Sequence, residues 1–220
     1  RKTVYDDIET LRIFGMKIEN RREKPSGYYL ADRDFSFPEL KILMDAVQSS
    51  RFITERQSRE LVRKLEHLTS ISEAKRLQSQ ASVLSGNKAV NHEIYDSIQR
   101  ICDAMADNRQ ICFNYYEWDF SRELKPKRDG ARYRVSPWKM IWNNENYYLI
   151  GLDERNGIVK HYRVDKIMHV SIESQKRNGE DIFRNFDFPK YVSGTFGMFG
   201  GKEQIVKMEF ENHFVGVVLD

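Results

Sequence analysis

From Ile111 onward, apolar and polar residues alternate with a period of two, which is the pattern of half-buried β-strands. Five short segments show it, and they are rich in aromatic and β-branched residues. In chain order they read ICFNYYEW, ARYRVSPWKMIW, NYYLIGLD, GIVKHYRVDKI and HVSIES, with clusters of turn residues between them. So many strands in so short a span suit a closed barrel better than an open sheet, because closure leaves no exposed edge. We therefore predict a small β-barrel over residues 110–176.

Residues 35–109 show a helical period instead. The segment SFPELKILMDAVQSS offers Ser36 as an N-cap ahead of an apolar stripe, and ERQSRELVRKLEHLTS and HEIYDSIQRICDAMADN repeat the pattern. A polar stretch, QSQASVLSGNKAVN, forms the predicted connection between the last two helices. Apolar stripes of this kind fit a dimerisation and linker module as well as a generic helical domain. Together with the strands that follow, they predict an α+β protein.

Residues 1–34 form a smaller unit. Val4, Ile8 and Leu11 recur at helical spacing, which predicts a short amphipathic helix ending near Gly15. The segment KIENRREKPSGYYL that follows predicts a β-hairpin, since two alternating strands flank a turn containing Pro-Ser-Gly. A helix followed directly by a hairpin is the order found in the second half of a winged helix-turn-helix domain.

Positive charge is concentrated in one part of the chain. The net charge of +3 is too small to indicate a partner, yet residues 121–139 contain seven lysines and arginines against Glu123 and Asp129. The predicted barrel therefore carries the positive excess.

The cysteine content and the lengths of the apolar segments indicate the cellular compartment to expect. Cys102 and Cys112 are the only cysteines, so the sequence excludes a disulfide framework and a four-thiolate zinc site. No window reaches the roughly 18 continuous apolar residues of a membrane span, and the start RKTVYDDIE lacks a signal-peptide core. We expect a reducing, cytoplasmic setting without membrane contact. Because the chain begins without Met and stops at VVLD within a pattern, we also expect truncation at both ends.

The known catalytic motifs are missing from the sequence. It contains no H-E-x-x-H, no G-x-S-x-G and no G-x-G-x-x-G after a strand, and its histidines show no metal-ligand spacing. The segment SGTFGMFGGKEQ looks like a phosphate loop but has Glu203 where a Mg²⁺-binding Ser or Thr is required, so we interpret it as a glycine-rich linker. His161 could act as a general base, yet no acid or nucleophile accompanies it. We expect neither enzymatic activity nor a cofactor or metal.

The segment KHYRVDKI is unusually charged for a barrel strand. Alternation puts Tyr162 and Val164 in the core and turns His161 and Arg163 outward. It leaves Lys160 and Lys166 at the rims of the core face. Arg and Lys bind phosphates, and tyrosines stack on bases or donate hydrogen bonds, so this strand and its neighbour predict an anion site. The candidate ligand-binding residues are Tyr148, Lys160, His161, Arg163 and Lys166.

An ordinary sheet surface is the alternative interpretation of the same strand. Arg163 and Asp165 would then pair with neighbouring strands, and the tyrosines would simply be packed, since charge pairs on sheets are common. Asp165 is ambiguous in either case: it could hold Arg163 ready for a ligand or prevent an anion from binding.

The run CFNYYEWD…RYRVSPWKMIWNNENYYLIGLDE…VKHYRVDKI resembles a WYL domain, whose Trp-Tyr-Leu motif reads Tyr147-Tyr148-Leu149 here. The beginning, RKTVYDDIETLRIFGMKIE…GYYL, resembles the recognition helix and wing that precede WYL domains in bacterial transcriptional regulators. The end, QIVKMEFENHFVGVVLD, is similar to the first strand and helix of the C-terminal extension of those proteins. The sequence departs from the pattern in two places: Tyr147 replaces the motif's Trp, and the first helices of the DNA-binding domain are missing.

The resemblance implies a DNA-binding regulator, expected to be a homodimer. Its WYL domain would be an SH3-like (Sm-like) barrel that senses a nucleotide or single-stranded nucleic acid. An RNA- or single-stranded-DNA-binding accessory protein that uses the barrel directly is the alternative. The expected divisions are a partial winged helix-turn-helix, a helical linker, the WYL barrel, a second linker and the start of the extension, at 1–34, 35–109, 110–176, 177–204 and 205–220.

Double-stranded DNA is the partner expected of the N-terminal unit. A winged helix places its recognition helix in the major groove while basic side chains contact phosphates. The helix would present its N-terminal residues to DNA, and the hairpin turn would contact the backbone unless its charges are merely solvated. The candidate DNA-binding residues are Lys2, Thr3, Tyr5, Arg21, Arg22 and Lys24.

Overall fold

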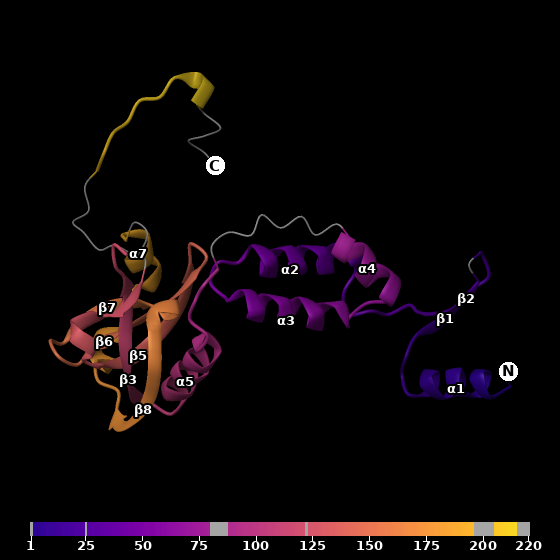
Figure 1. The fold of residues 1–220 in the computed structure, drawn as a ribbon, viewed down its shortest axis with the longest axis horizontal. Coiled ribbons are helices and arrows are strands. Elements are labelled where there is room, and N and C mark those ends of the chain that lie inside the picture. The colour runs from indigo at the N-terminus through magenta and orange to yellow at the C-terminus, as the bar shows by residue number, and fades with distance from the viewer. Residues whose placement is uncertain (1, 25, 80–87, 122, 196–204, 215–220) are drawn as a thin grey trace. The chain divides into compact units, whose positions relative to one another are not determined.

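The computed structural model describes residues 2–24, 26–79, 88–121, 123–195 and 205–214. It divides into two compact units, residues 1–92 and 93–220 (Figure 1). Among the described residues, no helix is long and apolar enough to cross a membrane.

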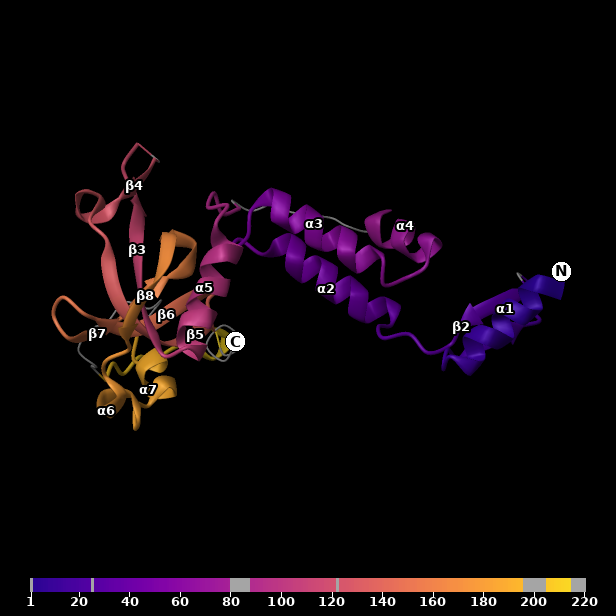
Figure 2. The same cartoon turned by 90° about the horizontal axis from the view of Figure 1, so that it is seen from below.

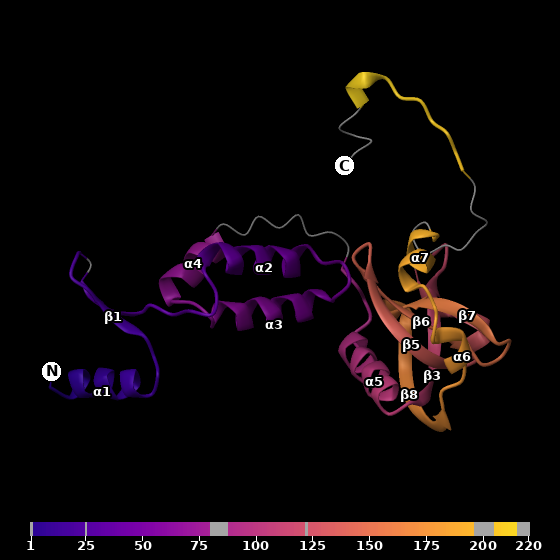
Figure 3. The same ribbon diagram turned by 180° about the vertical axis from the view of Figure 1, so that it is seen from behind.

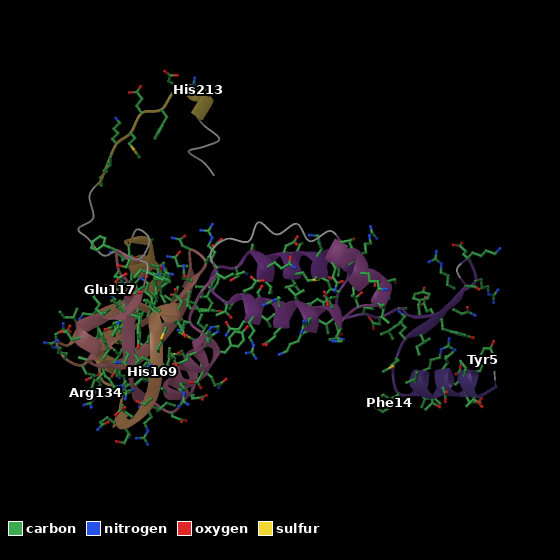
Figure 4. All side chains as sticks on the ribbon, viewed as in Figure 1. Tyr5, Phe14, Glu117, Arg134, His169 and His213 are labelled. Atoms are coloured by element: carbon green, nitrogen blue, oxygen red, sulfur yellow. The ribbon has the colours of Figure 1, made fainter. Side chains whose placement is uncertain are left out.

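The N-terminal unit begins with the predicted helix, α1 (Lys2–Ile13), and the predicted hairpin of β1 (Ile18–Arg21) and β2 (Gly27–Leu30). Arg12 joins them, since its guanidinium donates to the Ile18 carbonyl from Nε at 3.0 Å and from Nη2 at 2.7 Å. The apolar stripe of α1 is not covered: Val4 is 58% exposed, and Tyr5 and Phe14, at the two ends of the helix, are also exposed (Figure 4). The helix and hairpin are present, while the winged-helix assignment stays a prediction.

Three helices complete this unit: α2 (Phe37–Ser49), α3 (Glu55–Glu66) and α4 (Ile71–Ser79). Ser36 is the predicted N-cap of α2, and its backbone N–H donates to Glu39 at 2.7 Å, which satisfies an amide that the helix leaves unpaired. Leu40, Met44 and Leu77 form the buried core of the three helices. Most of the predicted polar connection, at residues 80–87, lies outside the described residues.

The second unit is a curled antiparallel sheet (Figures 2 and 3). Its strand order is β4-β3-β5-β6-β7, with β8 paired to β3 as well. No ladder joins β7 to β8 in the described part of the chain, so the sheet is a half-barrel and the SH3-like assignment is not confirmed. The strands are β3 (Arg109–Trp118), β4 (Leu124–Pro126), β5 (Tyr133–Asn143), β6 (Asn146–Asp153), β7 (Ile158–Arg163) and β8 (Ile167–Lys176).

The inside of the sheet is filled by aromatic rings, as its aromatic-rich strands predict. Phe113 stacks on Tyr133 with ring centroids 5.7 Å apart and meets Tyr162 edge to face at 5.3 Å. Val164 is fully buried beside them, as alternation predicted, although β7 ends at Arg163 and Val164 opens a 3₁₀ turn, η2 (Val164–Lys166).

Helix α5 (Ile94–Ala106) packs on this sheet, whereas the sequence placed it in the helical region 35–109. It contacts β3, β5, β8 and η2 (Figure 3). Ile94 and Ile101 are fully buried, and the Ser97 hydroxyl donates to the Ile167 carbonyl at 3.3 Å. The boundary between units therefore falls at 92/93, ahead of this helix.

The first part of the predicted linker 177–204 also packs on the sheet. Two short helices, α6 (Glu180–Phe183) and α7 (Phe188–Ser193), lie next to each other (Figure 2). Phe183 is buried against Ile150 and Leu152, and neighbouring aromatic residues extend this cluster. The glycine-rich part, residues 196–204, lies outside the described residues; beyond it, 205–211 form no strand and Asn212–Phe214 is a 3₁₀ turn, η3. The segment η1 (Lys127–Gly130) connects β4 to β5.

Candidate functional site

The pairing of β6 with β7 decides which of the predicted ligand-binding residues share a face. Tyr148 lies directly opposite Arg163, whereas His161 precedes Arg163 by two positions and Lys160 by three. Alternate residues of a strand project to the same side of a sheet. Tyr148, His161 and Arg163 therefore share one face, and Lys160 lies on the other.

Lys160 binds a buried carboxylate on that other face. Its ammonium lies 2.6 Å from the Asp153 carboxylate, which also accepts from the Tyr162 hydroxyl at 3.3 Å and the Arg155 backbone N–H at 3.0 Å. Burial opposes ionisation of Asp153, but these hydrogen bonds and the charges of Lys160 and Arg128 outweigh it and lower the pKa of Asp153. The structure thus separates Lys160 from the other predicted ligand-binding residues.

Arg163 is held by two side chains. Its Nε donates to Asp165 Oδ1 at 3.0 Å, and its Nη2 donates to Asp165 Oδ2 at 2.8 Å and to Asn146 Oδ1 at 2.9 Å. Burial alone would lower the pKa of Arg163, but the bond to Asp165 and its charge raise it. Nη1 donates to no group in the described residues, so Asp165 orients the guanidinium and leaves one nitrogen free.

Two tyrosines support Arg163 from either side of β7. The Tyr115 hydroxyl accepts from the Arg163 backbone N–H at 3.2 Å, and burial raises the pKa of Tyr115 to about 12. Tyr148 is 5% exposed and meets the His161 ring edge to face, with centroids 6.3 Å apart. Both tyrosines therefore stay neutral; Tyr148 lies opposite Arg163 in the ladder, and Tyr115 fixes the Arg163 backbone.

Lys166 lies in η2, three residues beyond Arg163. Burial and the charge of Arg163 lower the pKa of Lys166. It forms no ion pair or hydrogen bond within the described part of the chain. A half-buried lysine beside an arginine, without a carboxylate of its own, would be stabilised by an anion.

Comparison with known proteins identifies the segment that holds these residues. The family model described as "WYL domain" matches residues 96–172. This segment is a WYL domain. A solved structure, proteasome accessory factor B/C (PafBC) of Arthrobacter aurescens, is 15% identical with a TM-score of 0.34, and the match covers 76% of this chain and 24% of that one. The present chain thus spans about a quarter of that protein. None of the curated proteins compared matches the chain.

His161 of the WYL domain bonds to a residue beyond the matched segment. Its Nδ1 lies 2.8 Å from the Tyr191 hydroxyl of α7, and the rings are 5.9 Å apart. Sequence analysis missed Tyr191, Tyr115 and Asn146 as parts of the site. No local signal marked Tyr191, because the aromatic residues of this segment follow neither a strand nor a helix period.

Part of the positive excess of residues 121–139 is paired within the WYL domain. Lys125 pairs with Asp119 at 2.6 Å, and Lys127 pairs with Glu117 at 2.8 Å. Arg132 Nη2 donates to backbone carbonyls and a serine hydroxyl. The segment is therefore not a continuous basic surface. In the described residues, no group of His, Cys, Asp and Glu could hold a metal ion.

The residues predicted to bind DNA lie on α1 and the hairpin. Thr3, Arg21, Arg22 and Lys24 are exposed, and Lys2 is the first residue of α1. Tyr5 packs edge to face against Tyr28 of β2, with centroids 6.1 Å apart. Tyr5 thus fixes the helix against the hairpin in addition to any contact with DNA.

Proposed function

We propose that this chain is part of a bacterial DNA-binding transcriptional regulator whose WYL domain senses an anionic ligand, namely a nucleotide or single-stranded nucleic acid. The observation that supports the ligand site most is the pair formed by Arg163 and Lys166. Arg163 is oriented by Asp165 and Asn146 and keeps Nη1 free, while Lys166 lies nearby without a carboxylate partner.

Phosphate is the anion that this pair suits. The two N–H groups of Nη1, which Arg163 keeps free, can donate to phosphate oxygens, and the Lys166 ammonium adds a point charge. Because Tyr148 is buried, its role is to line the site and hydrogen-bond through its hydroxyl rather than to stack on a base. His161 lies beside Tyr148 on the same face.

The N-terminal unit supplies the proposed DNA contacts. The exposed cations of the hairpin turn would bind the phosphate backbone, and the start of α1 would enter the major groove. In a homodimer, a ligand of the WYL domain would alter DNA binding only if it bound one arrangement of the two DNA-reading heads better than another.

A binding experiment on the intact protein tests this function. Affinity for a defined duplex is measured by fluorescence anisotropy at several salt concentrations, with and without nucleotides or short single strands. We expect salt-sensitive duplex binding, because phosphate contacts release counterions, and a change in affinity when the second ligand is added. Binding to single strands without duplex affinity would contradict the proposal and favour the RNA- or single-stranded-DNA-binding accessory protein.

A further inference from the structure

A polar cavity lies at the end of the β6–β7 ladder away from Arg163, where Asp153 pairs with Ile158. Its volume is about 480 Å³, within the range of small-molecule sites. Four arginines line it: Arg128, Arg132, Arg134 and Arg155. All of them belong to the sheet unit, and Arg134 is labelled in Figure 4.

Arg128 is held at this cavity by a strained turn. Arg128 and Asp129 have φ of 54° and 52°, a left-handed conformation that side chains rarely adopt. The turn is fixed because the Asn114 amide donates to the Gly130 carbonyl at 2.7 Å, and the Arg128 guanidinium lies 4.1 Å from the Tyr133 ring centroid. Strain of this kind persists where a side chain must be kept in place, which is typical of binding sites.

The other three arginines keep donors for a ligand. Arg132 uses Nη2 for its hydrogen bonds, and Arg134 lies opposite Cys112 of β3. Arg155 is exposed, and among the described residues only its backbone N–H forms a hydrogen bond. In the described residues, none of these three guanidiniums lies within 4.0 Å of a carboxylate. The cavity therefore offers several N–H groups that only an outside acceptor could use.

The cavity also contains three carboxylates, which limit how negatively charged a bound ligand can be. Asp153 is neutralised by Lys160, whereas Glu154 accepts from Asn178 at 2.7 Å and Glu173 from Ser171 at 2.9 Å. The glutamates keep lone pairs for further donors and repel a highly charged polyanion. The arginines suit a single phosphate group, and the glutamates suit hydroxyl groups.

We propose that this cavity binds a hydroxyl-bearing phosphate monoester, such as a sugar phosphate. Its phosphate would lie among Arg132, Arg134 and Arg155, with its hydroxyls donating to Glu154 and Glu173. This site is distinct from the one at Arg163 and does not depend on the proposed function, because the two lie at opposite ends of the β6–β7 ladder.

Calorimetric titration of the full chain with ribose 5-phosphate, at low ionic strength, tests the site. Arg155→Gln should weaken binding at least about tenfold, the lower end of the effect of a charge-assisted hydrogen bond. It should not unfold the chain, since the backbone bond of Arg155 remains. The matched control is Lys139→Gln, which removes an exposed cation of β5 that has no partner in the described residues and should leave binding unchanged.

Further titrations distinguish this site from the one at Arg163. Arg163→Ala should leave the Arg155-dependent part of ribose 5-phosphate binding unchanged, and ribose alone should bind far more weakly than its phosphate. The proposal is wrong if ribose 5-phosphate does not bind saturably, if Arg163→Ala removes binding while Arg155→Gln keeps it, or if Lys139→Gln weakens it equally. Displacement by an oligothymidylate without a terminal phosphate would also overturn it, since the cavity would then bind the diester backbone of nucleic acid.

Discussion

Each end of the β6–β7 ladder carries an aspartate bound to a cation, and the two aspartates differ in burial. The Asp153 side chain is 1% exposed and accepts hydrogen bonds from Lys160, Tyr162 and the Arg155 backbone. The Asp165 side chain is 15% exposed, and its partner Arg163 is 37% exposed and keeps Nη1 free. The same pair of charges thus serves the fold where it is enclosed, and it can serve a ligand where one member reaches the solvent.

The largest expected effect is on stability at the buried end. Asp153→Asn would leave Lys160 and Arg128 without their carboxylate, which should lower the free energy of unfolding by about 3 kcal/mol, the scale of breaking a buried ion pair. Urea denaturation measures this. The control Asp129→Asn removes an exposed carboxylate without an ion pair in the described residues and should change stability by less than about 0.5 kcal/mol. Equal effects of the two variants would contradict the claim that the buried Asp153 ion pair stabilises the fold.

The pH dependence of stability should also report the contribution of Asp153. The pKa of Asp153 is lowered in the folded chain, so the folded state releases its proton more readily than the unfolded chain, where an aspartate has a pKa of about 3.9. The resulting stability is present above about pH 4 and is lost as the pH falls through the folded pKa. Urea midpoints below pH 4 should therefore fall more steeply for the wild type than for Asp153→Asn; parallel curves would exclude this contribution.

At the exposed end, the main effect should be on binding. Arg163→Ala should weaken the binding of an anionic ligand by about 1–3 kcal/mol, the scale of a charge-assisted hydrogen bond, without unfolding the sheet. Calorimetry with the nucleotide or oligonucleotide that binds the wild type measures the loss, and circular dichroism checks the fold. Unchanged affinity in a folded variant would remove Arg163 from the site.

The bond between His161 and Tyr191 should have a smaller effect. Tyr191→Phe removes one hydrogen bond while keeping the ring, so it should destabilise the chain by about 1 kcal/mol and increase hydrogen exchange in α7. Tyr116→Phe is the matched control, because the Tyr116 hydroxyl makes no hydrogen bond in the described part of the chain. If exchange in α7 were the same in both variants, the bond would not fix the helix.

The smallest stability effect should be at Lys166, with the opposite sign. Its lowered pKa means that folding disfavours its charge, so Lys166→Met should raise stability slightly, by about 0.5 kcal/mol. The same change should weaken anion binding, because the ammonium is lost. Reduced stability together with unchanged binding would show that Lys166 serves the fold instead.

Much of the fold follows from local pattern, because alternation reports which side chains share a face. It correctly buried Tyr162 and Val164 and separated Lys160 from Arg163. It did not show that β7 ends at Arg163, and this turn is what brings Asp165 back onto the guanidinium. The structure shows that Asp165 pairs with Arg163, and whether this pair favours or prevents anion binding stays a prediction.

The remainder depends on contacts between distant segments. Asp153 and Lys160 lie on different strands, and only the register of β6 with β7 brings them together. The aromatic residues of α6 and α7 were assigned to a linker because short helices carry too few turns to show a period. The boundary ahead of α5 was missed for a related reason, since an amphipathic stripe does not indicate which partner it covers.

The position of α5 determines which segment could be exchanged in a chimera of two proteins that contain a WYL domain. Glu93, at the start of the helix, accepts from the His169 backbone N–H at 2.8 Å, so the chain is fastened to β8 from its first residue after the boundary. A chimera joined at residue 110 would lack α5. The apolar face of the sheet that α5 covers would then be exposed and prone to aggregation. A chimera joined between His92 and Glu93 would transfer the WYL domain together with α5, which makes this the natural recombination point.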